Sequence, residues 1–320
     1  MDRQGALAGL VATLTRFASH RLARASSWCV ALSGGPDSLA LTAAAVNIRP
    51  TTALIVDHGL QDGSEIVAQT AKRQALELGC VAAHVVRVRV GRAGGPEAAA
   101  RTARYAALDS ARSGAPVLLA HTLDDQAETV LMGLGRGSGA RSIAGMRPGD
   151  PPWYRPLLGV RRSATLAVCA ELGLTAWNDP HNGDPRFTRA RLRAEVLPLL
   201  EDVLGGGVAG ALARTASALR EDTDALDSMA GQDLARARIG ADLAVAGVGE
   251  LPNALRRRVI RAWLLSGGAI GLTEQQIRAV DALVAEWRGQ GGVAVGGAVA
   301  NTRLFAERRG ETLTMRSEPV

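Results

Sequence analysis

The chain has little lysine and few aromatic residues, and its positive charge is concentrated in arginine. Lys72 is the only lysine, although lysine and arginine together number 37 against 31 acidic residues, and aromatics make up 3%. The planar fork of arginine suits bidentate contacts to phosphate. With a net charge of +6 and a pI near 10.1, we expect a polyanionic partner such as nucleic acid. A soluble basic protein without such a partner would have the same totals.

Cysteine is also scarce, and long apolar runs are missing. Cys29, Cys80 and Cys169 lie far apart and form no CxxC pair. A zinc site, a disulfide framework and a redox dithiol therefore lack support, and free thiols in a reducing compartment fit best. No apolar run approaches the length of a membrane span. The apolar run 6–14 follows an aspartate and precedes no small-residue cleavage site, so it predicts an amphipathic first helix. We expect a cytoplasmic protein with no membrane partner.

The first half of the chain alternates strand-like and helix-like patterns. Period-two apolar runs predict strands at 28–32, 52–57, 81–90 and 116–121, and helical patterns follow each, at about 36–47, 62–78, 96–113 and 123–134. Strands that alternate with helices favour an α/β fold with a doubly wound parallel sheet. Ligands of such sheets bind at the carboxyl ends of the strands. The glycine-rich segment 135–150 is expected to be irregular.

The pattern of helices and strands changes after the glycine-rich stretch 204–210. Helical patterns follow at about 211–235, 252–265 and 273–287, and turn-separated strand patterns occupy 291–316. We therefore predict a catalytic domain over residues 1–204 and a smaller domain of mixed helical and β structure over 205–320. The sequence leaves open whether the chain forms a homodimer.

The stretch Ser33-Gly34-Gly35-Pro36-Asp37-Ser38 follows a predicted strand and opens a predicted helix. Amides exposed by glycines at a helix N-terminus bind phosphate oxygens, and the serine hydroxyls are further donors. No Gly-Lys-Ser/Thr ending follows, so transfer of a γ-phosphoryl group loses support. Asp37 is consistent with a Mg²⁺ ligand beside a pyrophosphate. An aspartate that merely stabilises the first turn of its helix is the alternative, with even odds for this motif alone.

Acidic residues gather after the fourth predicted strand. His121 ends that strand, and Asp124, Asp125 and Glu128 lie in the first turns of the next helix. Residues three and four apart share a helix face, so the carboxylates are expected to face one way. Such a face binds Mg²⁺ or a cationic substrate. An ordinary acidic first turn capped by Thr122 is the alternative.

Arginines gather at a loop-to-helix junction further along. They are Arg186, Arg189, Arg191 and Arg193. Arg189 and Arg193 are four apart and share a helix face. This face is suited to RNA phosphates or a substrate carboxylate, whereas for an isolated cluster a solvated basic face is the more frequent explanation.

These motifs together resemble a known family. Ser-Gly-Gly-x-Asp-Ser after the first strand is the signature of PP-loop ATP pyrophosphatases, whose fold resembles the adenine-nucleotide hydrolases. The strings VDHGL (56–60), EAAARTARYAAL (97–108), HTLDDQAET (121–129), RGSGARSIAGM (136–146), RPLL (155–158) and DPHNGDPRFTRARLR (179–193) follow in order. Their order over the first two-thirds of the chain is similar to that of tRNA(Ile)-lysidine synthases.

The resemblance implies a reaction and its substrates. ATP, with Mg²⁺, would adenylate carbon-2 of the wobble cytidine of tRNA(Ile) with a CAU anticodon. The amine of free L-lysine would then displace AMP and leave lysidine. A carboxylate pair suits recognition of a dicationic amino acid, although only a neutral amine attacks. The partners implied are thus this tRNA and lysine.

The resemblance also implies residue roles. ATP is assigned to Ser33, Gly34, Gly35, Pro36, Asp37, Ser38 and His58, and the Mg²⁺ to Asp37. Arg104 and His121 would lie near the adenylate, with Asp37, Asp125 and Glu128 completing the catalytic set. Asp125 and Glu128 would take the lysine ammonium groups, whereas Arg136, Arg189 and Arg193 would face tRNA or the substrate carboxylate. Two positions depart from the family pattern: Ala190 stands where an asparagine is common, and Asp57 where a histidine is common.

Other functions fit less well. A tRNA cytidine thiolase of the same superfamily commonly uses CxxC pairs, which the sequence lacks. A glutamine-dependent synthase would need an amidotransferase part with an N-terminal catalytic cysteine. A non-catalytic RNA-binding protein with a degenerate nucleotide fold would not need Asp37 or the acidic cluster.

Overall fold

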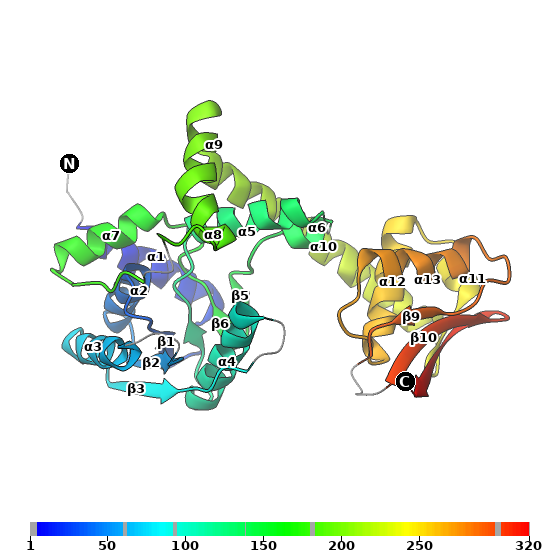
Figure 1. The fold of residues 1–320 in the computed structure, drawn as a ribbon, viewed down its shortest axis with the longest axis horizontal. Helices are drawn as coiled ribbons and strands as arrows, with labels where there is room; N and C mark the ends of the chain where they lie inside the picture. The colour runs from blue at the N-terminus through cyan, green and yellow to red at the C-terminus, as the bar shows by residue number, and fades with distance from the viewer. Residues whose placement is uncertain are drawn as a thin grey trace. The chain divides into compact units, whose positions relative to one another are not determined.

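The computed structural model describes residues 5–59, 63–91, 95–137, 139–179, 183–297 and 302–319, apart from the side chains of residues 96 and 97. Of the motif residues quoted above, 60, 138 and 180–182 lie outside these ranges. The chain forms two compact units (Figure 1). Unit 1 comprises Met1–Gly137 and Ser142–Ala216, and unit 2 comprises Ser138–Arg141 and Ser217–Val320. The domain boundary at 204/205 stays a prediction.

Unit 1 is built on a six-stranded sheet in the order β3-β2-β1-β4-β6-β5. Its strands are β1 (Trp28–Ala31), β2 (Thr51–Asp57), β3 (Ala82–Arg87), β4 (Val117–Leu118), β5 (Gly149–Asp150) and β6 (Trp153–Tyr154). All described pairings are parallel except that of β5 with β6. The order reverses between β1 and β4, which is where ligands bind in such sheets. The doubly wound α/β prediction is confirmed.

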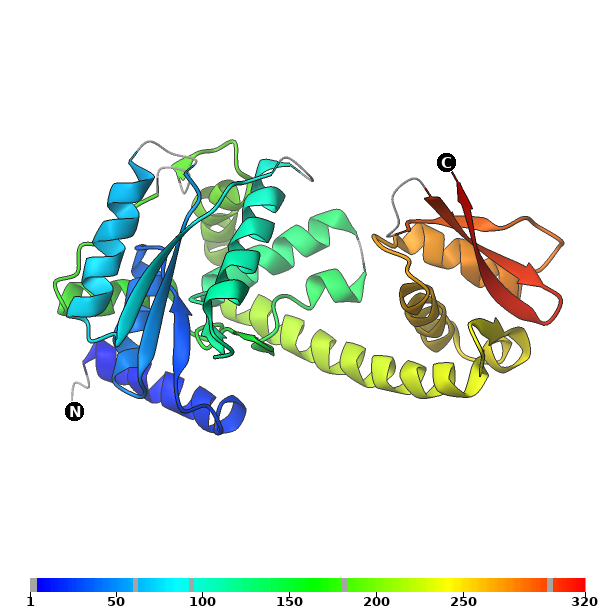
Figure 2. The ribbon, with the colours of Figure 1, turned by 90° about the horizontal axis from the view of Figure 1, so that it is seen from below.

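Helices cover both faces of this sheet (Figures 1 and 2). Unit 1 contains α1 (Ala6–Arg21), α2 (Pro36–Val46), α3 (Ser64–Glu77), α4 (Pro96–Ala111), α5 (Leu123–Arg136), α7 (Arg162–Glu171), α8 (Thr188–Arg191), the π-helical turn η2 (Leu192–Val196) and α9 (Leu197–Val203). The short α6 (Ala140–Ile143) lies where we expected irregular chain. Helix α7 and strands β5 and β6 were not predicted.

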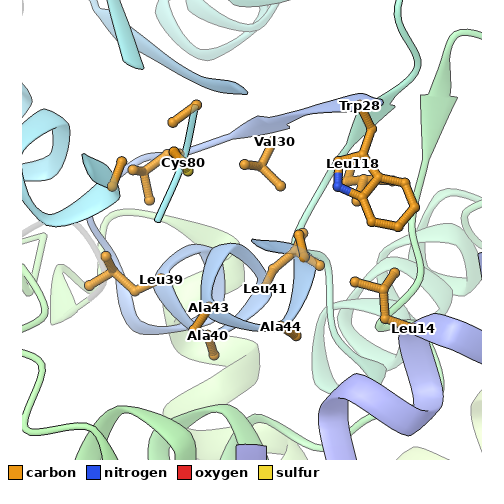
Figure 3. Packing of buried hydrophobic residues seen from close by; sticks show 14 of the residues in the cluster. Leu14, Trp28, Val30, Leu39, Ala40, Leu41, Ala43, Ala44, Cys80 and Leu118 are labelled. Carbon is orange, nitrogen blue, oxygen red and sulfur yellow. The ribbon is translucent and has the colours of Figure 1, made fainter. Parts of the chain in front are cut away.

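The period-two pattern of β1 explains why both faces are covered. Trp28 and Val30 point to a core formed with α1, α2 and α3, and Figure 3 shows them with Leu14 and Leu41. Cys29 points to the opposite core, formed with α4. Successive strand residues face opposite sides, so one short strand joins two apolar layers. The sheet and its loops are thereby held rigidly.

Unit 2 has a separate core under an antiparallel sheet. The order of this sheet is β7-β8-β11-β10-β9, formed by β7 (Arg238–Ile239), β8 (Asp242–Ala244), β9 (Val293–Val295), β10 (Thr302–Arg309) and β11 (Thr312–Pro319). Helices α11 (Val245–Gly249), α12 (Asn253–Ser266) and α13 (Glu274–Ala285) complete it, and α10 (Val208–Ala237) has residues in both units. Trp263 is fully buried in this core. The predicted mixed helical and β character is confirmed.

Within the described ranges, no single helix is long and apolar enough to cross a membrane. The helical segments Thr188–Val203 and Val208–Ala237 pass that test only when taken together, with a bend of 95° between them.

Candidate active site

The loop between β1 and α2 has the geometry expected of a phosphate-binding turn. Gly34 has a φ of +83°, a conformation that favours glycine. The Ser38 hydroxyl donates to the Gly35 carbonyl at 2.9 Å and accepts from the Ser33 amide at 3.2 Å. Pro36 begins α2, and Gly35 caps it without a side chain. The first turn of α2 therefore keeps its amides available for an anion.

Nitrogen-bearing side chains gather around the carboxyl ends of β2 and β4. Among the described residues, His58 Nδ1, His121 Nδ1, Arg104 Nε and Arg189 Nε are buried without a hydrogen-bond partner. Arg104 lowers the pKa of both histidines through its charge, in addition to burial. Arg189 acts in the same way on Arg104. Buried polar groups are normally paired, so these atoms point to a polar ligand, and the positive charge of Arg104 and Arg189 favours an anion.

The pKa of His121 falls to about 3, chiefly because burial disfavours its charged form. The nearby charges of Arg155 and Arg104 act in the same direction, whereas Asp125 opposes them. The imidazole is therefore neutral at pH 7. A neutral histidine beside an anion site donates one hydrogen bond and accepts another.

Helix α5 begins with a capping box that fixes Asp125. The Thr122 hydroxyl accepts from the Asp125 amide, while Asp125 Oδ2 accepts from the Thr122 amide at 2.8 Å and from its hydroxyl at 2.9 Å. Thr122 is fully buried. Such a cap satisfies the free amides at the start of a helix. The capping expected of Thr122 is thus present, and it also orients a buried carboxylate.

Three carboxylates and two guanidinium groups form a cluster beside the phosphate-binding turn. Arg162 Nε lies 3.0 Å from Asp37 Oδ2, and Arg162 Nη2 lies 2.6 Å from Asp125 Oδ1. Arg193 Nε lies 2.8 Å from Glu128 Oε1, and its Nη2 lies 3.3 Å from Asp125 Oδ1. The Glu128 side chain is completely buried. Buried charges require such pairing.

The pKa shifts of these carboxyl groups follow from burial and pairing. Burial raises the pKa of Asp37, against the opposing effects of Thr165 and Arg162. Burial likewise raises the pKa of Glu128, against Arg193. Burial also acts to raise the pKa of Asp125, but Arg162 and the Thr122 amide outweigh it and lower that pKa. Asp125 is thus the most firmly ionised member.

The structure brings most predicted site residues together. Asp37, Asp125, Glu128 and Arg193 meet in the cluster, whereas His58, Arg104, His121 and Arg189 influence one another through the charges described above. Arg136 is exposed at the end of α5, roughly 12 Å along the helix axis from Glu128 at 1.5 Å per residue. Its predicted contact with tRNA stays a prediction.

Two residues of the cluster were not predicted. Arg162 begins α7, and Thr165 of the same turn donates a hydrogen bond to Asp37 Oδ1. The sequence offers one signal for Arg162: the adjacent pair Arg161-Arg162 stands just before a helical pattern. It lies just after the RPLL string, but nothing in its spacing relates it to carboxylates far away in the sequence.

The donor set at Asp37 fits a Mg²⁺ that is held mainly by phosphate oxygens and water. A carboxylate beside a phosphate-binding turn is a hard oxygen ligand, and Mg²⁺ often uses one or two such groups together with substrate phosphates. Within the described part of the chain, no three His, Cys, Asp or Glu residues are grouped to hold a metal by themselves. Asp37 would therefore hold the ion together with ATP.

Two family models match parts of the chain. Residues 9–200 match the model of the PP-loop domain, and residues 243–313 match that of the TilS substrate binding domain. The first match spans more than half of the chain and includes every residue of the cluster.

Curated relatives match over the whole length. The chain is 67% identical over 324 residues to the tRNA(Ile)-lysidine synthase of Mycobacterium tuberculosis strain H37Rv, and the match covers all of both chains. It is 63% identical to that of Mycobacterium leprae, again over all of both chains. The protein of this name from Nocardia farcinica is 62% identical over 302 residues, covering 94% of this chain and 95% of the relative.

A solved structure shares the fold at low identity. It is the U34-tRNA thiolase NcsA from Methanococcus maripaludis with its [4Fe-4S] cluster, with a TM-score of 0.53 and 18% identity over 67% of this chain and 79% of that one. At this identity the likeness concerns the fold alone.

Proposed function

The chain belongs to the tRNA(Ile)-lysidine synthase family and is an ATP-dependent ligase, and from this premise we propose how its residues carry out the reaction. It forms lysidine at the wobble cytidine of tRNA(Ile) with a CAU anticodon. In the first step, the cytidine O2 attacks the α-phosphate of ATP and pyrophosphate leaves. In the second step, a neutral amine of lysine attacks carbon-2, and AMP leaves with its oxygen.

The phosphate-binding turn and the nitrogen-lined region are assigned to ATP. The turn 33–38 is assigned to the pyrophosphate, which its amides and hydroxyls would bind, and Asp37 would hold the Mg²⁺ that accompanies it. This ion supplies charge neutralisation at the departing phosphates. His58, Arg104 and His121 are assigned to the adenylate, since one buried nitrogen of each (His58 Nδ1, Arg104 Nε and His121 Nδ1) has no hydrogen-bond partner among the described residues. Electrostatic stabilisation of this kind is usually the largest contribution to catalysis.

The acidic part of the cluster is assigned to lysine. The observation that carries this assignment is that buried Asp125 and Glu128 already hold two guanidinium groups, so the pocket is built for cations. A carboxylate pair also favours an ammonium side chain over a neutral one.

Contacts to RNA or to the substrate carboxylate are assigned to Arg136, Arg189 and Arg193, of which Arg193 belongs to the cluster, and to unit 2. Arg189 has a buried Nε without a partner among the described residues, and Arg136 is exposed. Together with Arg193, they form the tRNA or substrate-carboxylate side of the site. Unit 2 contains the segment that matches the substrate binding domain and is assigned to tRNA. The homodimer and the cytoplasmic location stay proposals.

One assay tests the whole assignment. Purified protein is incubated with Mg-ATP, labelled lysine and a tRNA(Ile) transcript bearing CAU. We expect label to enter the tRNA with release of AMP and pyrophosphate. Asp109→Asn serves as an active control because Asp109 is exposed on α4 and its ion pair among the described residues is with Arg112 at 2.6 Å, not with a residue of the cluster. Pyrophosphate release without lysine uptake would contradict the amino-acid assignment.

A further inference from the structure

Arg162 contacts carboxylates from two different helices. Its Nε lies 3.0 Å from Asp37 on α2, its Nη2 lies 2.6 Å from Asp125 on α5, and its Nη1 lies 4.0 Å from Glu128 on α5. Asp37 belongs to the half of the site assigned to ATP, whereas Asp125 and Glu128 belong to the half assigned to lysine. Arg193 contacts only the two α5 carboxylates among the described residues. A single guanidinium therefore joins the two halves.

The position of Arg162 is itself fixed by its surroundings. Its backbone amide donates to Asp124 Oδ2 at 2.7 Å, which ties the start of α7 to the first turn of α5. Thr165, in the same turn of α7, donates to the other oxygen of Asp37. The Arg162 side chain is 19% exposed. Two residues in the first turn of α7 thus contact both carboxylate oxygens of Asp37.

The hydrogen bonds of Asp125 indicate how Arg162 fixes the orientation of this carboxylate, which is assigned to lysine. Oδ2 accepts two hydrogen bonds from Thr122, and Oδ1 accepts one each from Arg162 and Arg193. An ionised carboxylate offers about four acceptor positions, so Asp125 is saturated and its orientation is fully determined. An ammonium bound beside it must share Oδ1 or replace an arginine contact. Because Arg162 is the more buried of the two arginines, it is the one that keeps Asp125 in place.

Electrostatics requires a cation at this point. Two carboxylates that contact one guanidinium repel one another when water is largely excluded, and the charge of Asp125 acts to raise the pKa of Asp37, after the larger effect of burial. Arg162 lies between Asp37 and Asp125 and turns this repulsion into two attractions. The planar guanidinium can contact both at once, which the compact ammonium of a lysine side chain does less well.

We propose that Arg162 is a positioning residue shared by both steps of the reaction, holding Asp37 for adenylation and Asp125 for amine recognition through one guanidinium. Arg162 does not touch the reacting atoms; it acts through the two carboxylates. The inference rests on the proposed function, because the two carboxylates take their separate roles from it.

The test compares Arg162→Met, Arg162→Lys and the neighbouring control Arg161→Met. Arg161 is half exposed and pairs with Asp124 at 3.0 Å, outside the cluster. Pyrophosphate release without lysine measures adenylation, and labelled lysine uptake measures the second step. In Arg162→Met we expect the adenylation rate to fall and the KM for lysine to rise, each by about tenfold or more. Arg162→Lys should recover part of both losses, and Arg161→Met should stay within about threefold of the wild type.

A loss confined to one step would overturn the shared role, as would an equal loss in Arg161→Met. A purely structural role would lower the amount of active protein and leave the KM for lysine unchanged. Such a result would also overturn the proposal. Titration of the active sites with tRNA and ATP measures the amount of active protein, and so distinguishes a loss of folded enzyme from a change in the KM for lysine.

A second measurement needs no activity and is therefore independent of the proposed function. Asp37→Asn is made in the wild type and in Arg162→Met, and the midpoint of thermal unfolding is measured for all four proteins. With Arg162 present, Asp37→Asn should lower the midpoint because an ion pair is lost. With Arg162 absent, the same change should raise it because repulsion from Asp125 is relieved. The same sign in both backgrounds would overturn the proposal. Failure of the wild type to form lysidine would instead overturn the function.

Discussion

Asp37 and Glu128 lie in one charge cluster, yet we propose a different step of the reaction for each. Asp37 begins α2 beside the phosphate-binding turn, whereas Glu128 lies inside α5 with its carboxylate held by Arg193. The proposed roles in ATP chemistry and in amine recognition thus fall on different helices of one cluster.

We expect Asp37→Ala to abolish adenylation and Glu128→Ala chiefly to weaken the use of lysine. Removal of Asp37 takes away the proposed Mg²⁺ ligand, whereas removal of Glu128 takes away a partner of the ammonium group. Pyrophosphate release without lysine, and the KM for lysine where activity remains, distinguish the two. If both variants lost adenylation to the same degree, the division of roles would be wrong.

His121 gives the protein a pH dependence of known sign. Its pKa of about 3 in the folded chain is below the ordinary value of 6.5 because of burial. The unfolded chain therefore binds a proton first as the pH falls, and this group costs stability from about pH 6.5 downward until pH 3. We expect His121→Asn to flatten the loss of unfolding free energy between pH 7 and 4, as measured by urea titrations at several pH values. Parallel curves for variant and wild type would contradict the burial of a neutral imidazole.

At the scale of single elements, two helices begin with the same N-capping motif. Thr122 caps α5 and Thr273 caps α13, each in a capping box with the residue three positions on. Only the α5 cap also orients a cluster carboxylate. The two threonines thus form a matched pair in which stability and function can be separated.

We expect Thr122→Ala and Thr273→Ala each to lose about 1 kcal/mol of stability, the usual value of an N-cap. The KM for lysine should rise in Thr122→Ala because Asp125 loses the hydroxyl that holds Oδ2. In Thr273→Ala it should not change. Denaturant titrations and lysine kinetics on both variants provide the check, and an equal rise in both KM values would refute the link between cap and pocket.

Elements with strong local signals were predictable, and those held by distant partners were not. The strand at β1, the glycine turn and α2 follow from period-two patterning and from Pro36 at the helix start. Strands β5 and β6 have two residues each, too few for a periodic pattern. Arg162 is 125 positions from Asp37 in the sequence. Its role depends on the packing of α7 against α2, which no local pattern encodes.

At the scale of the whole molecule, each of the two units has apolar packing of its own. The core of unit 1 lies on both faces of its parallel sheet, and that of unit 2 lies around Trp263. Unit 2 also contains a buried ion cluster, in which Asp281 lies 2.6 Å from Arg256 and 2.9 Å from Arg257. Each unit can therefore be weakened through residues of its own.

We expect Asp281→Ala to destabilise unit 2 by about 3–5 kcal/mol, because it leaves buried Arg256 without its ionic partner. ATP binding should persist, since its proposed site lies in unit 1. The control Glu274→Ala removes an exposed pair with Arg278 in the same unit and should cost about 1 kcal/mol or less. Calorimetric unfolding and ATP binding on both variants are the measurements. Loss of ATP binding in Asp281→Ala alone would show that the units do not fold independently.

The three buried cysteines give the protein an internal reporter of local opening. Cys29, Cys80 and Cys169 are all buried, and all lie in unit 1. Burial raises the pKa of Cys80 to about 11, so a thiol reagent reacts mainly when the chain opens. Cys169 lies on α7, with its Sγ 3.4 Å from the Pro36 carbonyl at the start of α2. Its rate of labelling therefore follows the separation of the helix that carries Arg162 from the helix that carries Asp37.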